Sequence, residues 1–403
     1  MTLKEKRRID QLRHGIVPEG YKRTKVGICP EDWVENVLGD IYTERKEPGK
    51  EGLPLLMVSI HSGVSDGEVG EKDLPKRFKR IEDKSQYKRA VVGDLVFNMM
   101  RAWQGAIGSV RTEGMVSPAY VVAKPNDMVD PLFMDYYMKT NLIVHTIHRQ
   151  SYGVTDFRLR LYWESFAPIP CVLPPAREQK KIAEILTTQD KIIELEQQKI
   201  EEIKKVKRFF LEKMFPKEGQ TVPEIRFKGF TAPWEQRKLG DLLQTLPFKQ
   251  FLKEPEPDGK YEIIQQGNEP VIGFANGTPC GDYKDVVIFG DHTLSLYKPQ
   301  HPFFVATDGV RIVKGQQDTD GYYLLSLLER YKPQSEGYKR YYCILADTNC
   351  ITTYNTSEQG QIGAFFKHLD NLITLHQREL AEVGKYKKAL MQLLLTGLVR
   401  VNA

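Results

Sequence analysis

Two stretches of the sequence occur twice, far apart, and this internal repeat limits the available folds more than any other feature. The segment Trp33–Asp40 returns about 200 residues later as Trp234–Asp241, with Trp, Leu, Gly and Asp in register. The segment that starts at Glu178 returns about 180 residues later at Glu358. A repeat of long period is typical of duplicated structural units. The sequence therefore predicts two related halves whose ends match while the material between them differs.

Each copy of the second marker opens a long amphipathic helix. Mostly apolar residues recur there at alternating steps of four and three, which is typical of the seam between two packed helices. Charged residues fill the positions between them, so each helix buries only a narrow stripe and needs a partner. The predicted seam residues are Ile182, Leu186, Ile193, Ile200, Ile203 and Phe210 in the first copy, and Ile362, Phe366, Leu369, Ile373, Leu380, Val383 and Leu390 in the second.

The two stripes share one frame and the same polar interruptions, which favours packing of the two helices on each other. Ordinary packing inside a compact domain would explain a single stripe equally well. We expect an antiparallel pair, because each helix follows its own globular segment. The first helix is expected from about Ala176, after two prolines, to about Phe215, where Pro216 ends it. At 1.5 Å per residue it would span about 60 Å.

The segments between the repeated ends predict mixed lobes. Short β-rich runs occur at 55–60, 90–97 and 119–123 with a helix over 132–148, and at 261–264, 285–289, 303–306 and 309–313 with a helix over 322–330. The predicted fold class is α+β, with two globular lobes held apart by two long antiparallel helices in a pseudo-twofold repeat. The predicted boundaries are 1–28 for an N-terminal segment, 29–173 for the first lobe, 174–216 for the first long helix, 217–232 for a linker, 233–355 for the second lobe and 356–403 for the second long helix.

Composition excludes several classes of protein. The chain has 403 residues, of which 41% are hydrophobic and 28% charged, a balance that predicts packed cores. The charged first ten residues and the lack of an apolar run near 18 residues predict no secretion signal and no membrane span, and hence a cytoplasmic protein. Five scattered cysteines without a Cys-x-x-Cys pair predict reduced thiols. A net charge of +5 permits nucleic-acid binding without requiring it.

Motifs for catalysis are missing from the sequence. It contains no Gly-x-x-x-x-Gly-Lys-Ser/Thr loop, no Gly-x-Gly-x-x-Gly and no Asn/Asp-Pro-Pro-Tyr/Phe tetrapeptide. The Pro257–Glu262 segment is better explained as a polar turn than as a nuclease cluster. His145 and His148 lack a third metal ligand nearby, and Asp291-His292 lacks a nucleophile. We therefore predict a chain that is not an enzyme and binds no cofactor or metal.

Basic, aromatic and amide side chains gather in several polar segments, and these residue types suit DNA phosphates and base edges. The alternative, solvated loops and Gly-bearing turns balanced by nearby acidic residues, stays open. The candidates in the first half are Lys76, Arg77, Lys79, Arg80, Lys88, Arg89, Arg101, Gln104, Tyr152, Thr155 and Arg158. Those in the second half are Gln265, Gln266, Asn268, His292, Thr307 and Arg311.

Several segments in a fixed order resemble one known family. The central stretch Phe215-Pro216, Pro223–Phe230, Trp234 and Leu239–Asp241 resembles the central conserved region of type I restriction-modification specificity subunits. Further similar segments are Ile28–Trp33, Pro174–Ile182 and Leu394–Gly397 at the repeat ends, and Gly93–Asn98, Gln104–Gly108, Ser117–Tyr120, Phe289–Thr293 and Asp308-Gly309 inside the lobes. The resemblance covers essentially the whole chain.

The resemblance implies a division of labour. Each lobe would be a target recognition domain that reads one half of an asymmetric, bipartite site in double-stranded DNA. The helices would set the gap and dock two modification subunits, and restriction subunits would complete the complex. S-adenosylmethionine, ATP and Mg would be bound by the partner subunits and none by this chain.

Alternatives from other classes remain open. One is a coiled-coil adaptor that does not bind DNA, and another is the specificity chain of a related methylation-only or nuclease system. A self-sufficient nuclease or methyltransferase is disfavoured by the missing motifs.

Overall fold

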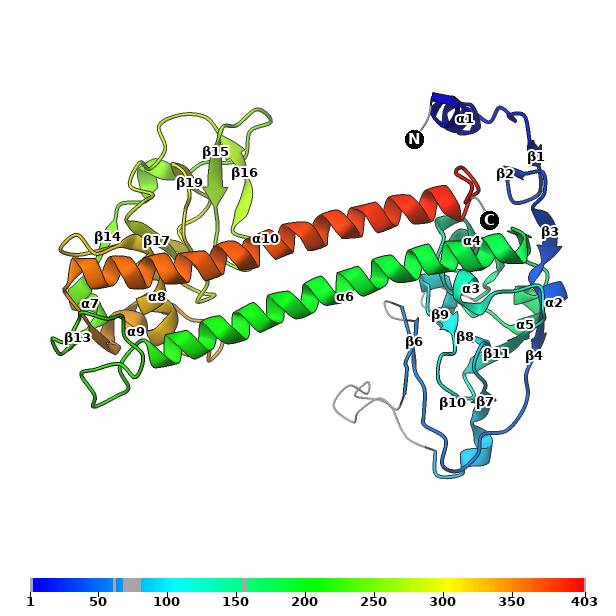
Figure 1. The fold of residues 1–403 in the computed structure, drawn as a ribbon, viewed down its shortest axis with the longest axis horizontal. Helices are drawn as coiled ribbons and strands as arrows, with labels where there is room; N and C mark the ends of the chain where they lie inside the picture. The colour runs from blue at the N-terminus through cyan, green and yellow to red at the C-terminus, as the bar shows by residue number, and fades with distance from the viewer. Residues whose placement is uncertain (1–2, 61–62, 68–80, 154–157, 402–403) are drawn as a thin grey trace. The chain divides into compact units, whose positions relative to one another are not determined.

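The computed structural model describes residues 3–60, 63–67, 81–153 and 158–401 (Figure 1). The chain divides into two compact units, Met1–Glu194 with Ala381–Ala403, and Leu195–Leu380. Two long helices, α6 (Ala176–Lys213) and α10 (Thr356–Leu394), contribute residues to both units. The 38 residues of α6 correspond to a helix about 57 Å long.

The lobe of unit 1 is built around a four-stranded antiparallel sheet of order β4-β11-β8-β9. Its strands are β4 (Tyr42–Glu44), β11 (Tyr120–Pro125), β8 (Leu95–Asn98) and β9 (Ile107–Ser109). Smaller pairs join β1 (Tyr21–Arg23) to β2 (Ile28–Pro30), β3 (Val34–Val37) to β12 (Pro170–Leu173), β5 (Val58–Ser59) to β6 (Gly63–Val64), and β7 (Lys88–Ala90) to β10 (Gly114–Val116). The helices are α1 (Leu3–Arg13), α2 (Leu38–Ile41), α3 (Pro131–Tyr137), α4 (Asn141–Gln150) and α5 (Trp163–Phe166), with the 3-10 turns η2 (Lys84–Gln86) and η3 (Ala102–Gln104).

The lobe of unit 2 repeats this plan, with a sheet of order β14-β20-β17-β18. Its strands are β14 (Leu243–Leu246), β20 (Val310–Gly315), β17 (Val286–Gly290) and β18 (Leu296–Tyr297). The strand β13 (Glu235–Lys238) pairs with β21 (Asn349–Thr352), and a second sheet has the order β16 (Val271–Ala275), β15 (Tyr261–Ile264), β19 (Phe303–Val305). The helices are α7 (Leu239–Leu242), α8 (Gly321–Tyr331) and α9 (Tyr342–Asp347), with the turn η5 (Lys249–Phe251). The predicted α+β duplication is confirmed.

The predicted apolar stripes form the parts of α6 and α10 that face protein. Ile182 and Leu186 belong to the core of unit 1, and Leu390 packs against that core. The core of unit 2 contains Ile362, Phe366 and Leu369, with Ile203 and Phe210 packed against it. Ile200 is buried, and the other stripe residues, Ile193, Ile373, Leu380 and Val383, are half-buried. Within each unit, the N-terminal turns of one long helix and the C-terminal part of the other therefore pack into the same core.

Ion pairs show that α6 and α10 run antiparallel, as predicted. In unit 2, Lys207 Nζ lies 2.6 Å from Asp370 Oδ1. In unit 1, Lys387 pairs with Asp190. These two residues are the repeat-related counterparts of Lys207 and Asp370. Glu196 Oε2 lies 2.7 Å from His376 Nδ1, and these two positions are themselves related by the repeat. Repeat-related positions meet only at the centre of an antiparallel pair, so Glu196 and His376 mark that centre.

The repeated Trp and Glu of the sequence are hydrogen-bonded to each other in each unit. Trp33 Nε1 donates to Glu178 Oε2 at 3.1 Å, and Trp234 Nε1 donates to Glu358 Oε1 at 3.3 Å. An arginine completes each cluster. Arg400, after α10, bonds Glu178, and Arg226, after α6, bonds Glu358. Each pairing satisfies a carboxylate that is almost completely buried.

In each lobe the repeated Gln connects the long helix to the N-terminus of a shorter helix, α3 in unit 1 and α8 in unit 2. Gln179 Oε1 accepts from the backbone N–H of Asp130 at 2.9 Å, and Gln359 Oε1 accepts from that of Asp320 at 3.3 Å. The side chains of Asp130 and Asp320 in turn cap α3 and α8. The Glu-Gln pair is therefore an anchor that joins each lobe to the start of its long helix.

Several predicted element boundaries were wrong. The helix expected over 132–148 is divided into α3 and α4, because Thr140 takes an extended backbone conformation and starts a new helix. The strand expected over 90–97 is divided into β7 and β8 by a turn in which Asp94 accepts from Val91 N at 2.8 Å. Within 55–60 only Val58–Ser59 is a strand, and α6 ends at Lys213.

In the part of the chain described here, no helix is both long and apolar enough to span a membrane.

Candidate nucleic-acid interface

One end of each four-stranded sheet carries a loop that returns from the lobe helices and is tied to the central strand. Met99 directly follows β8, and its carbonyl accepts from Leu161 N at 2.9 Å. Asp291 directly follows β17, and its carbonyl accepts from Tyr341 N at 2.7 Å. These two places correspond in the two lobes. The Asp130 and Asp320 anchors lie beyond the opposite ends of the sheets, where β11 and β20 finish.

In unit 1 this end of the sheet is basic and aromatic. A shallow hollow is lined by Met100, Tyr152, Arg158, Arg160 and Tyr162, among others. The Tyr152 ring packs on Tyr162 with 5.4 Å between centroids. Arg101 and Gln104 are exposed on the connector that follows β8. The structure thus brings together four of the candidate residues, namely Arg101, Gln104, Tyr152 and Arg158, on two neighbouring loops.

In unit 2 the corresponding end carries amides and a histidine. Gln266 Oε1 accepts from His292 N at 3.0 Å, and the side chain of Gln266 lies over two glycines. A Cβ at Gly309 would come within 2.4 Å of Gln266 Nε2, so any other residue there would displace the end of the Gln266 side chain. Gln265 donates to Glu269 O at 3.0 Å. Asn268 and Thr307 are exposed nearby in sequence, on the loops after β15 and β19.

The His292 ring is held between two neighbours. Its Nδ1 lies 3.1 Å from Lys339 O, and its plane stacks on Tyr338 at 4.6 Å with an interplanar angle of 5°. Sequence reasoning missed Tyr338. The signal that would have found it is the run Gly337-Tyr338-Lys339-Arg340, an aromatic residue between a glycine and two cations.

Three candidate cations already have partners within the chain. Lys88 Nζ donates to Tyr120 O at 2.7 Å, and burial lowers the pKa of Lys88. Arg89 pairs with Glu47 and Glu113. Arg311 Nη2 lies 3.2 Å from Asp291 Oδ2. Their assignment to DNA contact stays a prediction, and it would require these bonds to be shared or exchanged.

The remaining basic candidates, Lys76, Arg77, Lys79 and Arg80, lie outside the described residues, as does Thr155.

Three side chains of types that bind metal ions, Glu196, His376 and Glu379, lie together at the centre of the helix pair. The carboxylate oxygens of Glu196 and Glu379 lie 2.7 and 3.1 Å from His376 Nδ1. Lys199 also bonds Glu196 at 2.8 Å. The hydrogen bonds from Lys199 and His376 lower the pKa of the Glu196 carboxyl. The four side chains form an ion-pair network, and the prediction that the chain binds no metal is not tested by it.

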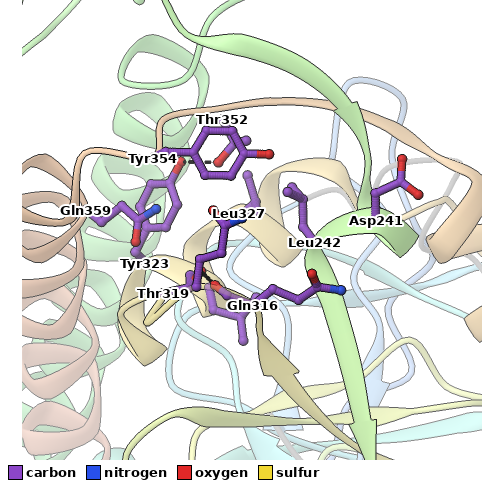
Figure 2. A pocket seen from close by; sticks show the side chains of 11 residues that line it. Asp241, Leu242, Gln316, Thr319, Tyr323, Leu327, Thr352, Tyr354 and Gln359 are labelled. Atoms are coloured by element: carbon purple, nitrogen blue, oxygen red, sulfur yellow. Dashed lines mark hydrogen bonds between the residues drawn. The ribbon is translucent and has the colours of Figure 1, made fainter.

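A second hollow lies in unit 2 at the anchor end of the sheet. Figure 2 shows Gln316 and Thr319 facing Tyr323, Thr352 and Gln359 across it, with a hydrogen bond of 2.8 Å between the hydroxyls of Tyr323 and Thr352. Its volume of about 30 Å³ suits one or two water molecules, whereas ligand pockets measure hundreds of Å³. This hollow belongs to the anchor and not to the candidate interface.

Comparison with known proteins shows similarity to one family. The family model described as "Type I restriction modification DNA specificity domain" matches residues 119–205. The putative type I restriction enzyme MjaX specificity subunit of Methanocaldococcus jannaschii is 25% identical over an alignment that covers 95% of this chain and 97% of the relative. The chain is thus similar over nearly its whole length to a type I restriction specificity subunit. The MjaVIII specificity subunit of the same organism is 23% identical to this chain, with coverage of 95% and 97%.

Two solved structures share the fold of this chain. The S subunit of the type I system from M. genitalium matches with a TM-score of 0.60 and 14% identity, covering 92% of this chain and 97% of the other. A chain from a study of complex assembly and conformational transition in the type I system matches with a TM-score of 0.53 and 14% identity, covering 92% and 99%.

Proposed function

We propose that this chain is the DNA-recognition subunit of a type I restriction-modification complex, in which each lobe binds one half of a bipartite target. One observation carries the proposal. The same end of the same sheet, free of the helix anchor in both lobes, presents side chains suited to nucleic acid. The subunit itself is non-catalytic, and the chemistry would belong to its partners.

The two half-sites should differ because the two lobes present different chemistry. Arginines such as Arg101 and Arg158 in unit 1 suit the acceptor edge of guanine, whereas amides such as Asn268 in unit 2 suit adenine. The asymmetry supports a target whose two halves are unlike.

The long helices support a target with a gap. The length of α6, about 57 Å, exceeds one turn of B-DNA, which is about 34–36 Å. Two recognition lobes joined by such helices would contact two short sequences separated by unread base pairs.

The same helices offer matched surfaces for partner subunits. Leu195 on α6 and Leu375 on α10 are repeat-related, and their exposed fractions are 55% and 49%. Val206 and Tyr386 form a second repeat-related pair, exposed by 44% and 58%. Contiguous exposed apolar patches mark interaction sites, and the recurrence of these exposed side chains at matched positions of the two helices supports such a patch on each. Because each surface occurs twice, the proposal includes two copies of the modification subunit.

The proposal assigns the remaining parts of the complex to other chains. The modification subunits would bind S-adenosylmethionine and extrude the target adenine. Restriction subunits would bind ATP and Mg and act on the DNA.

Sequencing of host DNA with detection of modified bases, with and without this gene, tests the proposal. We expect the gene to be required for methylation of one motif made of two short, unlike halves around a fixed gap. Loss of a palindrome or of one uninterrupted motif would contradict the two-lobe assignment. An assembled complex of this chain with the modification subunit that shows no salt-dependent binding to duplex DNA would favour the adaptor alternative.

A further inference from the structure

Two tyrosines occupy corresponding places at the free ends of the two sheets. Tyr152 lies at the start of the return loop of unit 1, whose end is tied to β8 through Leu161 and Met99. Tyr338 lies on the return loop of unit 2, whose end is tied to β17 through Tyr341 and Asp291. The two loops differ in sequence, so the shared feature is an aromatic ring at one place in a duplicated fold.

Both rings are strongly exposed, although large aromatic side chains usually stabilise a fold by being buried. Tyr152 is 60% exposed and Tyr338 is 87% exposed. No hydrogen bond of either hydroxyl is found among the described residues. Neither ring therefore contributes much to its own core, which makes a role in binding the better explanation.

Each ring nevertheless packs against one neighbouring ring, Tyr338 in a parallel stack and Tyr152 at a tilt of 34°. Tyr152 packs on Tyr162, and Tyr338 lies parallel to His292. The His292 ring is itself held through Lys339 O, and the His292 backbone N–H donates to Gln266. A ring that packs against a single neighbour and is exposed to this extent leaves much of its surface open to solvent. Such pre-orientation lowers the entropy lost when a second flat group binds.

Cations accompany both rings. Arg158 and Arg160 line the same hollow as Tyr152, and Arg340 is exposed two residues after Tyr338. Open aromatic faces beside exposed arginines are the chemistry of nucleic-acid binding, in which the ring contacts bases and the cations contact phosphates. Aromatic and apolar side chains also enter partly opened base steps of duplex DNA.

We propose that Tyr152 and Tyr338 are the corresponding ring contacts of the two lobes, each packing its open face against a nucleobase of its own half-site. The inference rests on the proposed function, because it needs each lobe to bind DNA. It adds to that function a distinction between the roles of neighbouring residues. These two rings supply apolar contact to the bases, whereas the neighbouring arginines supply charge.

The test uses the complex assembled with its modification subunits and a duplex that carries the motif found by methylation sequencing. Tyr152→Ala and Tyr338→Ala should each weaken binding about tenfold or more, as removal of a stacking ring does. The dependence of log Kd on log salt should keep its slope, because no phosphate contact is lost. Tyr152→Phe and Tyr338→Phe should bind like the wild type, because the ring and not the hydroxyl is required.

Half-site exchange then separates the two lobes. When the half-site of the altered lobe is replaced by unrelated sequence, each Tyr→Ala variant should lose less affinity than the wild type does. When the other half-site is replaced, the variant and the wild type should lose the same. Met128→Ala and Tyr354→Ala are matched controls, since both side chains are exposed but lie near the anchor ends of the sheets. Unchanged thermal unfolding of every variant checks that the exposed substitutions leave the fold intact.

The outcomes distinguish the inference from the proposed function. If the wild-type complex binds no duplex specifically, the proposed function fails and the inference with it. If the wild type binds its target and both Tyr→Ala variants bind equally well, the inference alone is overturned. It is also overturned if Tyr→Ala weakens assembly with the modification subunits instead of DNA binding, which would make the rings a protein contact.

Discussion

The two units use the same ion pair between α6 and α10 but complete it differently. In unit 1, Lys387 pairs with Asp190, and the hydroxyl of Tyr136 from α3 donates to Asp190 at 2.6 Å. In unit 2, Lys207 pairs with Asp370, and the third member is the carboxylate of Glu329 from α8, 2.6 Å from Lys207 Nζ. A neutral phenol therefore fastens one lobe to the helices, and a second carboxylate fastens the other.

The difference makes the second lobe depend on one buried cation. Burial lowers the pKa of Lys207, yet the two carboxylates together raise it above its ordinary value. Burial raises the pKa of Glu329, against the effect of Lys207, and Asp370 raises it further. In unit 1 the phenol needs no counter-charge, although burial and the bond to Asp190 raise its pKa. The same position in a duplicated fold can thus carry attachments with different electrostatics.

The largest expected effect comes from removing the lysine of each cluster. Lys207→Met leaves two carboxylates unpaired in a largely buried site and should cost about 3–5 kcal/mol in the free energy of unfolding of unit 2. Lys387→Met leaves only Asp190, which keeps its bond from Tyr136 and is partly solvated, and should cost about 1 kcal/mol. Denaturant unfolding with hydrogen exchange measures both effects and assigns each to its unit. Equal losses would show that the third member does not matter.

Periodicity allowed the long helices and the duplicated plan to be predicted from the sequence. A stripe at steps of four and three is a local property of the chain, so Ile182 and Ile362 could be placed in cores before any contact was known. The repeated Trp, Glu and Gln were visible as markers. Their roles were not, because Arg226 and Arg400 follow their helices at different distances and fall outside any sequence register.

The candidate interface was predicted less well, because contacts between distant segments decide which polar side chains remain free. Arg89 was expected to meet phosphate, but Glu47 and Glu113 come beside it through strand pairing that the sequence does not display. Tyr338 was overlooked because its partner His292 is 46 residues away and meets it only through the tie between Tyr341 and Asp291.

The second prediction separates the packing of the helix pair from the docking of partners. Ile200 on α6 is 5% exposed, whereas Val206 on the same helix is 44% exposed. Ile200→Asp buries a charge and should destabilise unit 2 by about 2–4 kcal/mol, with loss of partner docking as a consequence. Val206→Asp should leave unfolding unchanged and weaken docking alone. Sedimentation of the mixture with modification subunits, beside thermal unfolding, measures the two effects.

Unchanged assembly by the Val206→Asp variant would remove that residue from the docking surface. Tyr386→Asp, its repeat-related counterpart, then shows whether the two proposed docking surfaces are equivalent.

The third prediction compares an exposed arginine with one that is held in an ion pair. Arg158 in unit 1 is exposed beside Tyr152, whereas Arg311 in unit 2 is held by Asp291 and lies over the Tyr342 ring. If Arg158 contacts a base edge, Arg158→Ala should relax specificity at one position of the first half-site by about 1–3 kcal/mol. Arg311→Ala should mainly lower the stability of unit 2. Binding to a library of single-base variants distinguishes them, since loss of a phosphate contact weakens all sequences alike.

The smallest expected effect tests the carboxylate that distinguishes the two clusters. Because the folded protein raises the pKa of Glu329, the native state holds this proton more tightly than the unfolded chain does. The contribution of Glu329 to stability therefore grows as the pH falls through the folded-state pKa and is least favourable at neutral pH and above. Glu329→Gln should stabilise unit 2 at pH 8 by about 1 kcal/mol and flatten its pH dependence relative to the wild type.

Tyr136→Phe in unit 1 is the matched control, because its phenol stays protonated over the whole range and the variant should shift stability by the same amount at pH 5 and pH 8. Denaturant midpoints at both pH values measure these differences. A Glu329→Gln variant that is less stable at pH 8 than at pH 5, relative to the wild type at each pH, would mean that the charged carboxylate is required to hold Lys207. In that case the two clusters would differ in geometry alone and not in their response to protons.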